Sequence, residues 1–166
     1  MRPQDVVVLL KILSLNGKEW QYRDLAQVLS ISISEVSDSL RRSHIAGLID
    51  ESKKKVFRLS LMEFIEFGLH YVFPQIPGTM VIGLPTGHSH PIFKKKFISN
   101  ENYVWPFIDG KIRGLAIEPL YKGAVESSQK DPVLYLMLAC IDMIRLGSTR
   151  EKKEALNELK KLILHE

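Results

Sequence analysis

A chain of 166 residues with 45% hydrophobic and 25% charged residues has the composition of a soluble globular protein, which excludes wholesale disorder. Its longest apolar run, from Pro132 to Ile141, is too short for a membrane span of roughly 20 residues, and its first residues do not form a secretory signal. The single cysteine, Cys140, excludes an intramolecular disulfide. We therefore expect a cytoplasmic protein with no membrane partner, and the net charge of +4 permits a nucleic-acid partner without requiring one.

The first third of the chain predicts three helices. Apolar residues at helical spacing indicate a first helix over residues 6–15, and a second is expected from about residue 23. Ser32 and Glu35 form a capping box, in which each side chain accepts a hydrogen bond from a free backbone N–H of the other residue. We expect this box to open a third helix that runs to about Ala46.

A β-hairpin and a fourth helix are expected next. Residues 55–59 alternate in polarity and follow a polar turn, so they predict a hairpin with residues 48–50. A second capping box, Ser60 with Glu63, is expected to open a helix that Pro74 ends.

The segment from residue 74 to about 123 changes character and is rich in proline and glycine. Short strand-like pieces at 80–82, 103–105 and 112–117 indicate a β-rich region. A turn at Asp109-Gly110 predicts that the last two pieces form a hairpin.

The last forty residues predict two helices. The first, 132–146, follows the N-cap Asp131 and ends at Gly147. It is apolar almost all round, so we expect it to be buried on more than one side. A capping box, Ser148 with Glu151, opens the closing amphipathic helix.

The stretch from Arg23 to Ile49 resembles winged helix-turn-helix transcriptional regulators, the MarR-like group among them. The matching residues are Leu25-Ala26 on the second helix, Val36-Ser37 and Leu40-Arg41-Arg42 on the third, and Gly47-Leu48-Ile49 at the entry to the wing. The resemblance implies an α+β protein with a winged helix-turn-helix DNA-binding domain over 1–73. A β-rich module that ends in two α-helices would follow over 74–166, for dimerisation or partner binding.

The resemblance also implies a function and a site. The third helix of such a domain enters the major groove of double-stranded DNA. At 100° per residue, Ile33, Val36 and Leu40 face the first two helices, while Ile45 points outward and is expected to pack under the C-terminal part. The candidate DNA contacts on the opposite face and on the wing are Ser34, Ser37, Asp38, Arg41, Arg42, Lys53, Lys54, Lys55 and Arg58.

The function expected from these features is a transcriptional regulator, a repressor that acts as a homodimer. A further resemblance, to the second halves of antitoxin-type regulators that accompany nucleotidyltransferases, implies autoregulation and a toxin-like partner enzyme. It is carried by residues 103–106 through Arg113-Gly114 and 118–121, then by Asp131-Pro132 and residues 142–151. A second hypothesis is a protein-interaction module whose C-terminal part binds and restrains a partner enzyme. The residues leave open whether that part binds a small molecule, a protein or only itself. The apolar helix 132–146 places the expected dimer interface in the last forty residues.

Other chemistry is not expected. His88 and His90 are two residues apart and share a face if they lie on a strand, but no further ligand has the spacing of a metal site. Cys140 lies in the most apolar helix, where a thiol is a small hydrophobe. No phosphate-binding glycine loop or catalytic signature is present, so we expect no enzymatic activity, no metal and no cofactor. Asp142, Arg145, Arg150 and Glu151 are predicted to form an ion-pair network.

Overall fold

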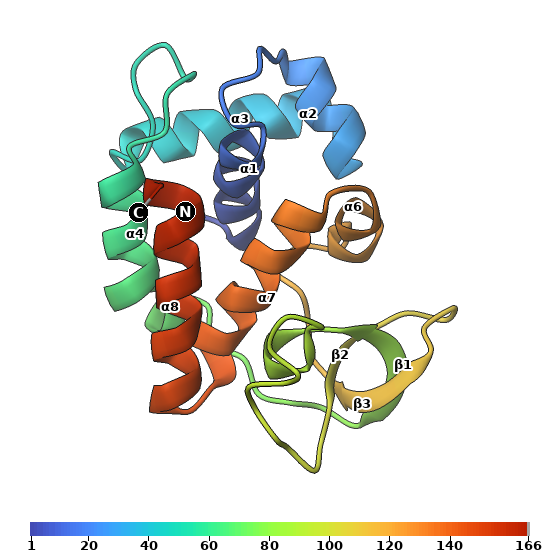
Figure 1. Ribbon diagram of the computed structural model, residues 1–166. Coiled ribbons are helices and arrows are strands. Elements are labelled where there is room, and N and C mark those ends of the chain that lie inside the picture. The colour runs from blue at the N-terminus through green and yellow to red at the C-terminus, as the bar shows by residue number, and fades with distance from the viewer. Residues whose placement is uncertain (166) are drawn as a thin grey trace.

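A computed structural model describes residues 1–165 and has an α+β fold, with a small sheet at one end of the molecule beside a body of helices (Figure 1). No helix in this range is long and apolar enough to cross a membrane. The helices are α1 (Pro3–Ser14), α2 (Tyr22–Leu29), α3 (Ile33–Ile45), α4 (Arg58–Phe67), α5 (Leu69–Val72), α6 (Ala124–Lys130), α7 (Pro132–Leu146) and α8 (Thr149–Leu164). The strands are β1 (Met80–Pro85), β2 (Tyr103–Pro106) and β3 (Ile112–Ala116), and η1 (Gly87–Ser89) is a 3-10 turn.

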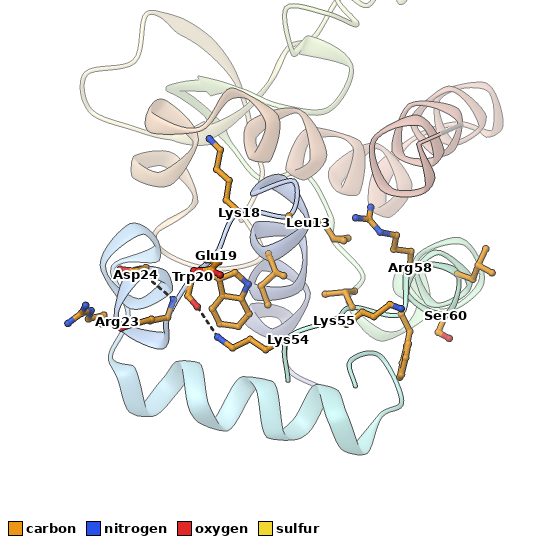
Figure 2. Close-up of a pocket in the computed structure, with 16 residues that line it drawn as sticks. Leu13, Lys18, Glu19, Trp20, Arg23, Asp24, Lys54, Lys55, Arg58 and Ser60 are labelled. Carbon is orange, nitrogen blue, oxygen red and sulfur yellow. Dashed lines mark hydrogen bonds between the residues drawn. The ribbon is translucent and has the colours of Figure 1, made fainter. Parts of the chain in front are cut away.

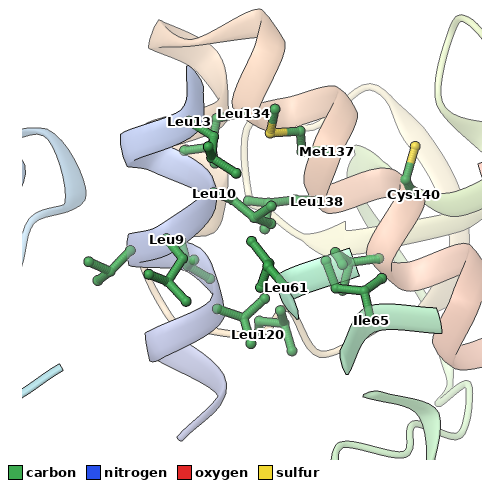
Figure 3. Close-up of a cluster of buried hydrophobic side chains, with 14 of the residues drawn as sticks. Leu9, Leu10, Leu13, Leu61, Ile65, Leu120, Leu134, Met137, Leu138 and Cys140 are labelled. Atoms are coloured by element: carbon green, nitrogen blue, oxygen red, sulfur yellow. The ribbon is translucent and has the colours of Figure 1, made fainter. Parts of the chain in front are cut away.

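Helix α1 is buried on every side. Its five residues from Val6 to Leu10 are fully buried, because α2 and α3 cover one side of the helix and α7 covers another. Leu10 of α1, Leu61 of α4 and Leu138 of α7 point into one cluster (Figure 3). A single continuous core therefore joins the first 73 residues to the rest of the chain.

The hairpin predicted after α3 forms only in part: Ile49 and Val56 make one antiparallel bridge, and the N–H groups of Asp50 and Phe57 donate to the carbonyl oxygens of Lys55 and Leu48 at 2.9 Å. Asp50 explains the difference. One of its carboxylate oxygens accepts the N–H groups of both Lys54 and Lys55 at 2.8 Å, which closes the segment as a loop. Helix α4 then begins at Arg58, two residues before the capping box expected at Ser60.

The three strands form a closed barrel with an unexpected topology. Strand β1 pairs antiparallel with β2 through residues 83–85 and with β3 through residues 80–83, so β2 and β3 run parallel. The predicted hairpin of β2 and β3 is therefore wrong, although all three strands lie where the sequence indicates. The barrel is closed tightly, since a Cβ on Gly110 would lie 2.6 Å from the backbone of Gly83.

The burial expected for α7 is confirmed. Eleven of its residues are buried, and its neighbours include α1, α5, α6, α8 and η1 of the same chain. The short helix α6 was not expected from the sequence. Because other elements of the same chain cover α7, its apolar surface does not require contact with a second copy of the protein.

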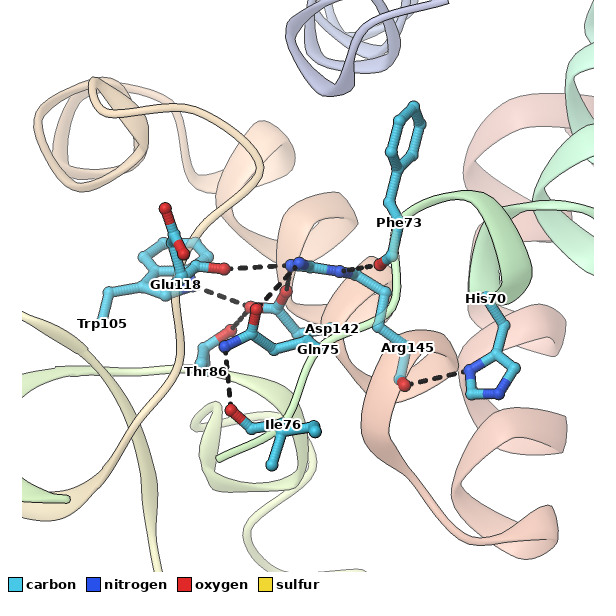
Figure 4. A network of polar contacts seen from close by, with 9 residues as sticks. All are labelled: His70, Phe73, Gln75, Ile76, Thr86, Trp105, Glu118, Asp142 and Arg145. Atoms are coloured by element: carbon cyan, nitrogen blue, oxygen red, sulfur yellow. Dashed lines mark hydrogen bonds and ion pairs between the residues drawn. The ribbon is translucent and has the colours of Figure 1, made fainter. Parts of the chain in front are cut away.

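A buried polar network fixes α7 to the barrel and to the segment after α5 (Figure 4). The Asp142 carboxylate accepts hydrogen bonds from Thr86 Oγ1 at 2.6 Å and Trp105 Nε1 at 2.7 Å, and it pairs with Arg145 at 3.0 Å. Arg145 also donates to the carbonyl oxygens of Phe73 and Glu118. The predicted four-residue network is thus reduced to Asp142 and Arg145. Of the other two members, Arg150 lies over the Phe97 ring and Glu151 pairs with His88.

Candidate nucleic-acid interface

Helix α3 presents a long polar face to solvent. Its inner face packs on α1 and α2 through Val36 and Leu40, which are fully buried. Among the predicted contacts, Ser34, Ser37, Asp38 and Arg41 are all exposed on its outer face. The prediction for Ile33 is wrong, since this residue is 55% exposed. Ile33 is the first residue of the helix and lies beyond the contacts that cover Val36.

The two adjacent arginines of α3 have different environments. Arg41 is 62% exposed, and its one partner is Asp38 at 3.4 Å. Arg42 turns inward and donates from Nε at 2.9 Å and from a terminal nitrogen at 2.7 Å to the fully buried Asp5 carboxylate. Arg42 therefore holds α3 against α1, and this engagement does not favour its prediction as a DNA contact.

Lys53, Lys54 and Lys55 lie on the loop that Asp50 closes. The Ser52 hydroxyl and the N–H groups of Lys55 and Lys54 donate to Asp50, and these bonds lower the pKa of its carboxyl to about 2. Lys54 is partly engaged, because its ammonium lies 3.8 Å from the Trp20 ring centroid and donates to the Trp20 carbonyl. Lys55 is exposed, so the loop holds a free cation at a defined place.

Arg58 is not part of this loop. It is the first residue of α4, and it donates a hydrogen bond to the carbonyl of Ile163 near the end of α8. This position does not favour its prediction as a DNA contact, because residues 58 and 59, predicted as the end of a strand, belong to α4.

Two exposed cations that the sequence analysis did not single out lie near this loop. Arg23 is in the first turn of α2, and Lys18 precedes that helix. Both line a cavity of about 1140 Å³ between residues 17–24 and residues 54–60, with Trp20 and Lys54 inside it (Figure 2). The position of Arg23 gives a signal that could have found it, because the helix before a recognition helix crosses the DNA backbone.

The acidic residues of α3 are partly neutralised by local bonds. Glu35 accepts the backbone N–H of Ser32 at 2.8 Å, which lowers the pKa of its carboxyl and completes the predicted capping box. Asp38 lies beside Arg41. The outer face of α3 therefore presents the hydroxyls of Ser34 and Ser37, the carboxylate of Asp38 and the guanidinium of Arg41. Arg23 lies on the preceding helix α2, and Lys55 lies on the loop that follows α3.

His88, His90 and Cys140 are buried in the interior of the protein. His88 lies with Nδ1 2.9 Å from Glu151 Oε1 and Nε2 2.9 Å from the Glu101 carbonyl oxygen. His90 is buried against Tyr135, and burial lowers the pKa of its imidazole to about 4. Burial also raises the pKa of the Cys140 thiol. Within residues 1–165, no group of three or more His, Cys, Asp or Glu side chains could hold a metal ion.

Comparisons with models of known families, with curated proteins and with solved structures found no match.

Proposed function

We propose that this protein is a DNA-binding transcriptional regulator of the winged helix-turn-helix type, a cytoplasmic repressor that acts as a homodimer. The observation that carries the proposal is the outer face of α3. It is polar along its first turns and exposed to solvent, and Arg41 lies on it. Arg23 lies on α2, the helix before α3, and Lys55 lies on the loop after α3.

The chemistry of this face fits the major groove of a duplex. Ser34 and Ser37 supply hydroxyls, which donate to or accept from base edges, and Asp38 can accept from the amino group of cytosine. Arg41 reaches either guanine or a phosphate, while Arg23 and Lys55 are placed for the sugar-phosphate backbone. Three exposed cations would bind DNA modestly, so two copies on two half-sites suit this surface better than one.

A second candidate function, binding and restraint of a partner enzyme, draws support from the β-rich segment. Ile76, Ile98 and Ile108 lie on its loops and are each more than four-fifths exposed. Exposure of large apolar side chains to water costs free energy, and a partner protein that covers them removes this cost. An antitoxin-like repressor of its own operon would combine both functions.

The salt dependence of duplex binding tests the proposal. Fluorescence anisotropy of a labelled duplex should show affinity that falls steeply as salt rises, because each phosphate contact releases counterions. An unrelated duplex should bind more weakly than one selected from random sequences. Absence of duplex binding at low salt would refute the DNA-binding proposal and leave the partner-enzyme function as the better account.

A further inference from the structure

A stripe of large apolar side chains runs along the outer side of α4 and α5. Leu59, Phe67 and Tyr71 are separated by multiples of four residues and are 72%, 69% and 80% exposed. Phe67 and Tyr71, four residues apart across Gly68, are neighbours in this spacing, and Leu59 lies two turns before Phe67 on the side of α4 away from the buried Leu61 and Ile65. Glu63 is the polar member at the same spacing, and α8 covers a different side of α4.

The same face contains a hollow. A cavity of about 550 Å³ lies between the C-terminal end of α3 and α4, and its lining includes Met1, Leu48, Phe64 and Phe67. Ile45 comes just before this lining in the chain and is 75% exposed, so its expected packing under the C-terminal part is wrong. Protruding apolar side chains and a recess for them therefore lie next to one another.

We infer that this face, formed by Ile45, Leu59, Phe67, Tyr71 and the hollow beside them, binds a second copy of this chain around a twofold axis. A twofold interface uses the same patch on both subunits, so the patch must be complementary to itself. The hollow beside Phe67 meets this requirement, because the protruding aromatic side chains of one copy can fill the recess of the other.

The area of this face is consistent with an interface to a second copy of the chain. The four named side chains expose most of their surface and together offer on the order of 500 Å² of apolar area, since an aromatic side chain alone can bury 150–250 Å². With the polar rim added, the patch approaches the roughly 800 Å² per partner of a stable protein–protein interface. The alternative location on α7 is excluded by the burial of that helix within one chain.

The inference deepens the proposed function, which uses two half-sites on DNA. Figure 1 shows α3 across the top of the molecule and α4 descending from the end of it. A twofold axis that runs alongside α4 would therefore present two α3 helices on the same side of the dimer. A palindromic operator requires this arrangement.

Sedimentation equilibrium without DNA tests the inference. The wild type should have twice the 19.0 kDa mass of one chain at micromolar concentration. The double variant Phe67→Ser, Tyr71→Ser should raise the dimer dissociation constant by roughly 100-fold or more, because central aromatic side chains dominate interface energies. The matched control Ile98→Ser, Ile108→Ser removes two exposed apolar residues elsewhere and should remain dimeric. The two control residues are more exposed than Phe67 and Tyr71, so they remove at least as much exposed apolar surface. A monomeric wild type, or a double variant that dimerises as the wild type does, would overturn the inference.

Cysteine cross-linking supplies a second measurement that does not depend on the mass. Cys140 is fully buried, so a Tyr71→Cys variant would carry one accessible thiol. This variant should form a covalent dimer under mild oxidation, whereas Ile108→Cys should not. Equal cross-linking of the two variants would contradict the location of the interface. Neither measurement includes DNA, so a stable dimer that binds no duplex refutes the DNA-binding function and leaves this inference intact. A monomer that binds duplex refutes this inference and the proposed homodimer, but not DNA binding.

Discussion

Arg42 of α3 and Asp5 of α1 form a two-pronged ion pair with nitrogen–oxygen distances of 2.7 and 2.9 Å. Burial alone would raise the pKa of Asp5, but the hydrogen bonds from Arg42 and from the backbone of Arg2 lower it. The pair therefore fixes the position of α3 on α1 and leaves Arg41 as the arginine of α3 that faces solvent.

The two arginines should respond differently to truncation. Arg42→Ala leaves the Asp5 carboxylate buried without its partner, and we expect a loss of about 3 kcal/mol in the free energy of unfolding. Arg41→Ala removes an exposed side chain and should change it by less than about 0.5 kcal/mol. Urea unfolding at neutral pH measures both. Equal stability of the two variants would show that the Asp5–Arg42 pair does not hold the helices together.

His90 should make the protein less stable in mild acid. Burial lowers its folded-state pKa to about 4, whereas the value in an unfolded chain is about 6.5. As the pH falls from 6.5 towards 4, the unfolded chain binds a proton that the folded protein does not. This stabilises the unfolded state relative to the folded state. At pH 4.5 this contribution is about 2 kcal/mol.

The variant His90→Phe tests this contribution because it keeps an aromatic ring against Tyr135. Urea unfolding at pH 7 and 4.5 should show a smaller loss of stability in the variant than in the wild type. An identical loss in both proteins would assign the acid sensitivity to other groups.

Asp142 should be necessary for the attachment of α7 to the barrel. Asp142→Ala leaves Trp105 Nε1 and Thr86 Oγ1 without their acceptor and Arg145 without its carboxylate. We expect a loss of about 3 kcal/mol or more, the usual cost of an unpaired buried charge. The Trp105 fluorescence should also shift, and a Trp20→Phe background separates this signal from that of the other tryptophan. Unchanged stability and emission would contradict the role of the network.

The Asp50 side chain should order the tip of the loop that it closes. Asp50→Ala removes the acceptor of the Lys54 and Lys55 N–H groups, so their hydrogen exchange should become faster. If Lys55 contacts phosphate, duplex affinity should fall several-fold as well, while Asp50→Asn, which keeps one oxygen acceptor, should lie between. Exchange rates that stay at the wild-type value in Asp50→Ala would disprove this role.

The sequence predicts the elements that local signals define. The capping boxes at Ser32 and Ser148 begin α3 and α8 where expected, and Asp131 caps α7. Spacing of apolar residues also predicts the burial of α7, because no single-sided helix has that pattern.

The predictions that differ from the structure concern features that contacts between distant residues determine. Asp5 lies 37 residues before Arg42, and helical spacing alone cannot reveal that a polar residue on the edge of a helix turns inward towards such a partner. Strands β2 and β3 pair directly and in parallel, and each also pairs antiparallel with β1, so the topology depends on a strand that lies earlier in the chain. The hairpin after α3 is shorter than predicted because the Asp50 side chain accepts the N–H groups of Lys54 and Lys55 and helix α4 begins at Arg58.

The most direct test of DNA binding neutralises the three free cations of the interface. The variant Arg23→Gln, Arg41→Gln, Lys55→Gln should bind a selected duplex far more weakly than the wild type. The slope of log affinity against log salt should become shallower by about 2 to 3, roughly one unit for each lost phosphate contact. The control Lys94→Gln, Lys95→Gln, Lys153→Gln makes the same change in net charge at exposed positions in the second half of the chain and should bind as the wild type does. Equal affinity and slope in the two triple variants would contradict the assignment of α3 and its flanking elements as the DNA-binding surface.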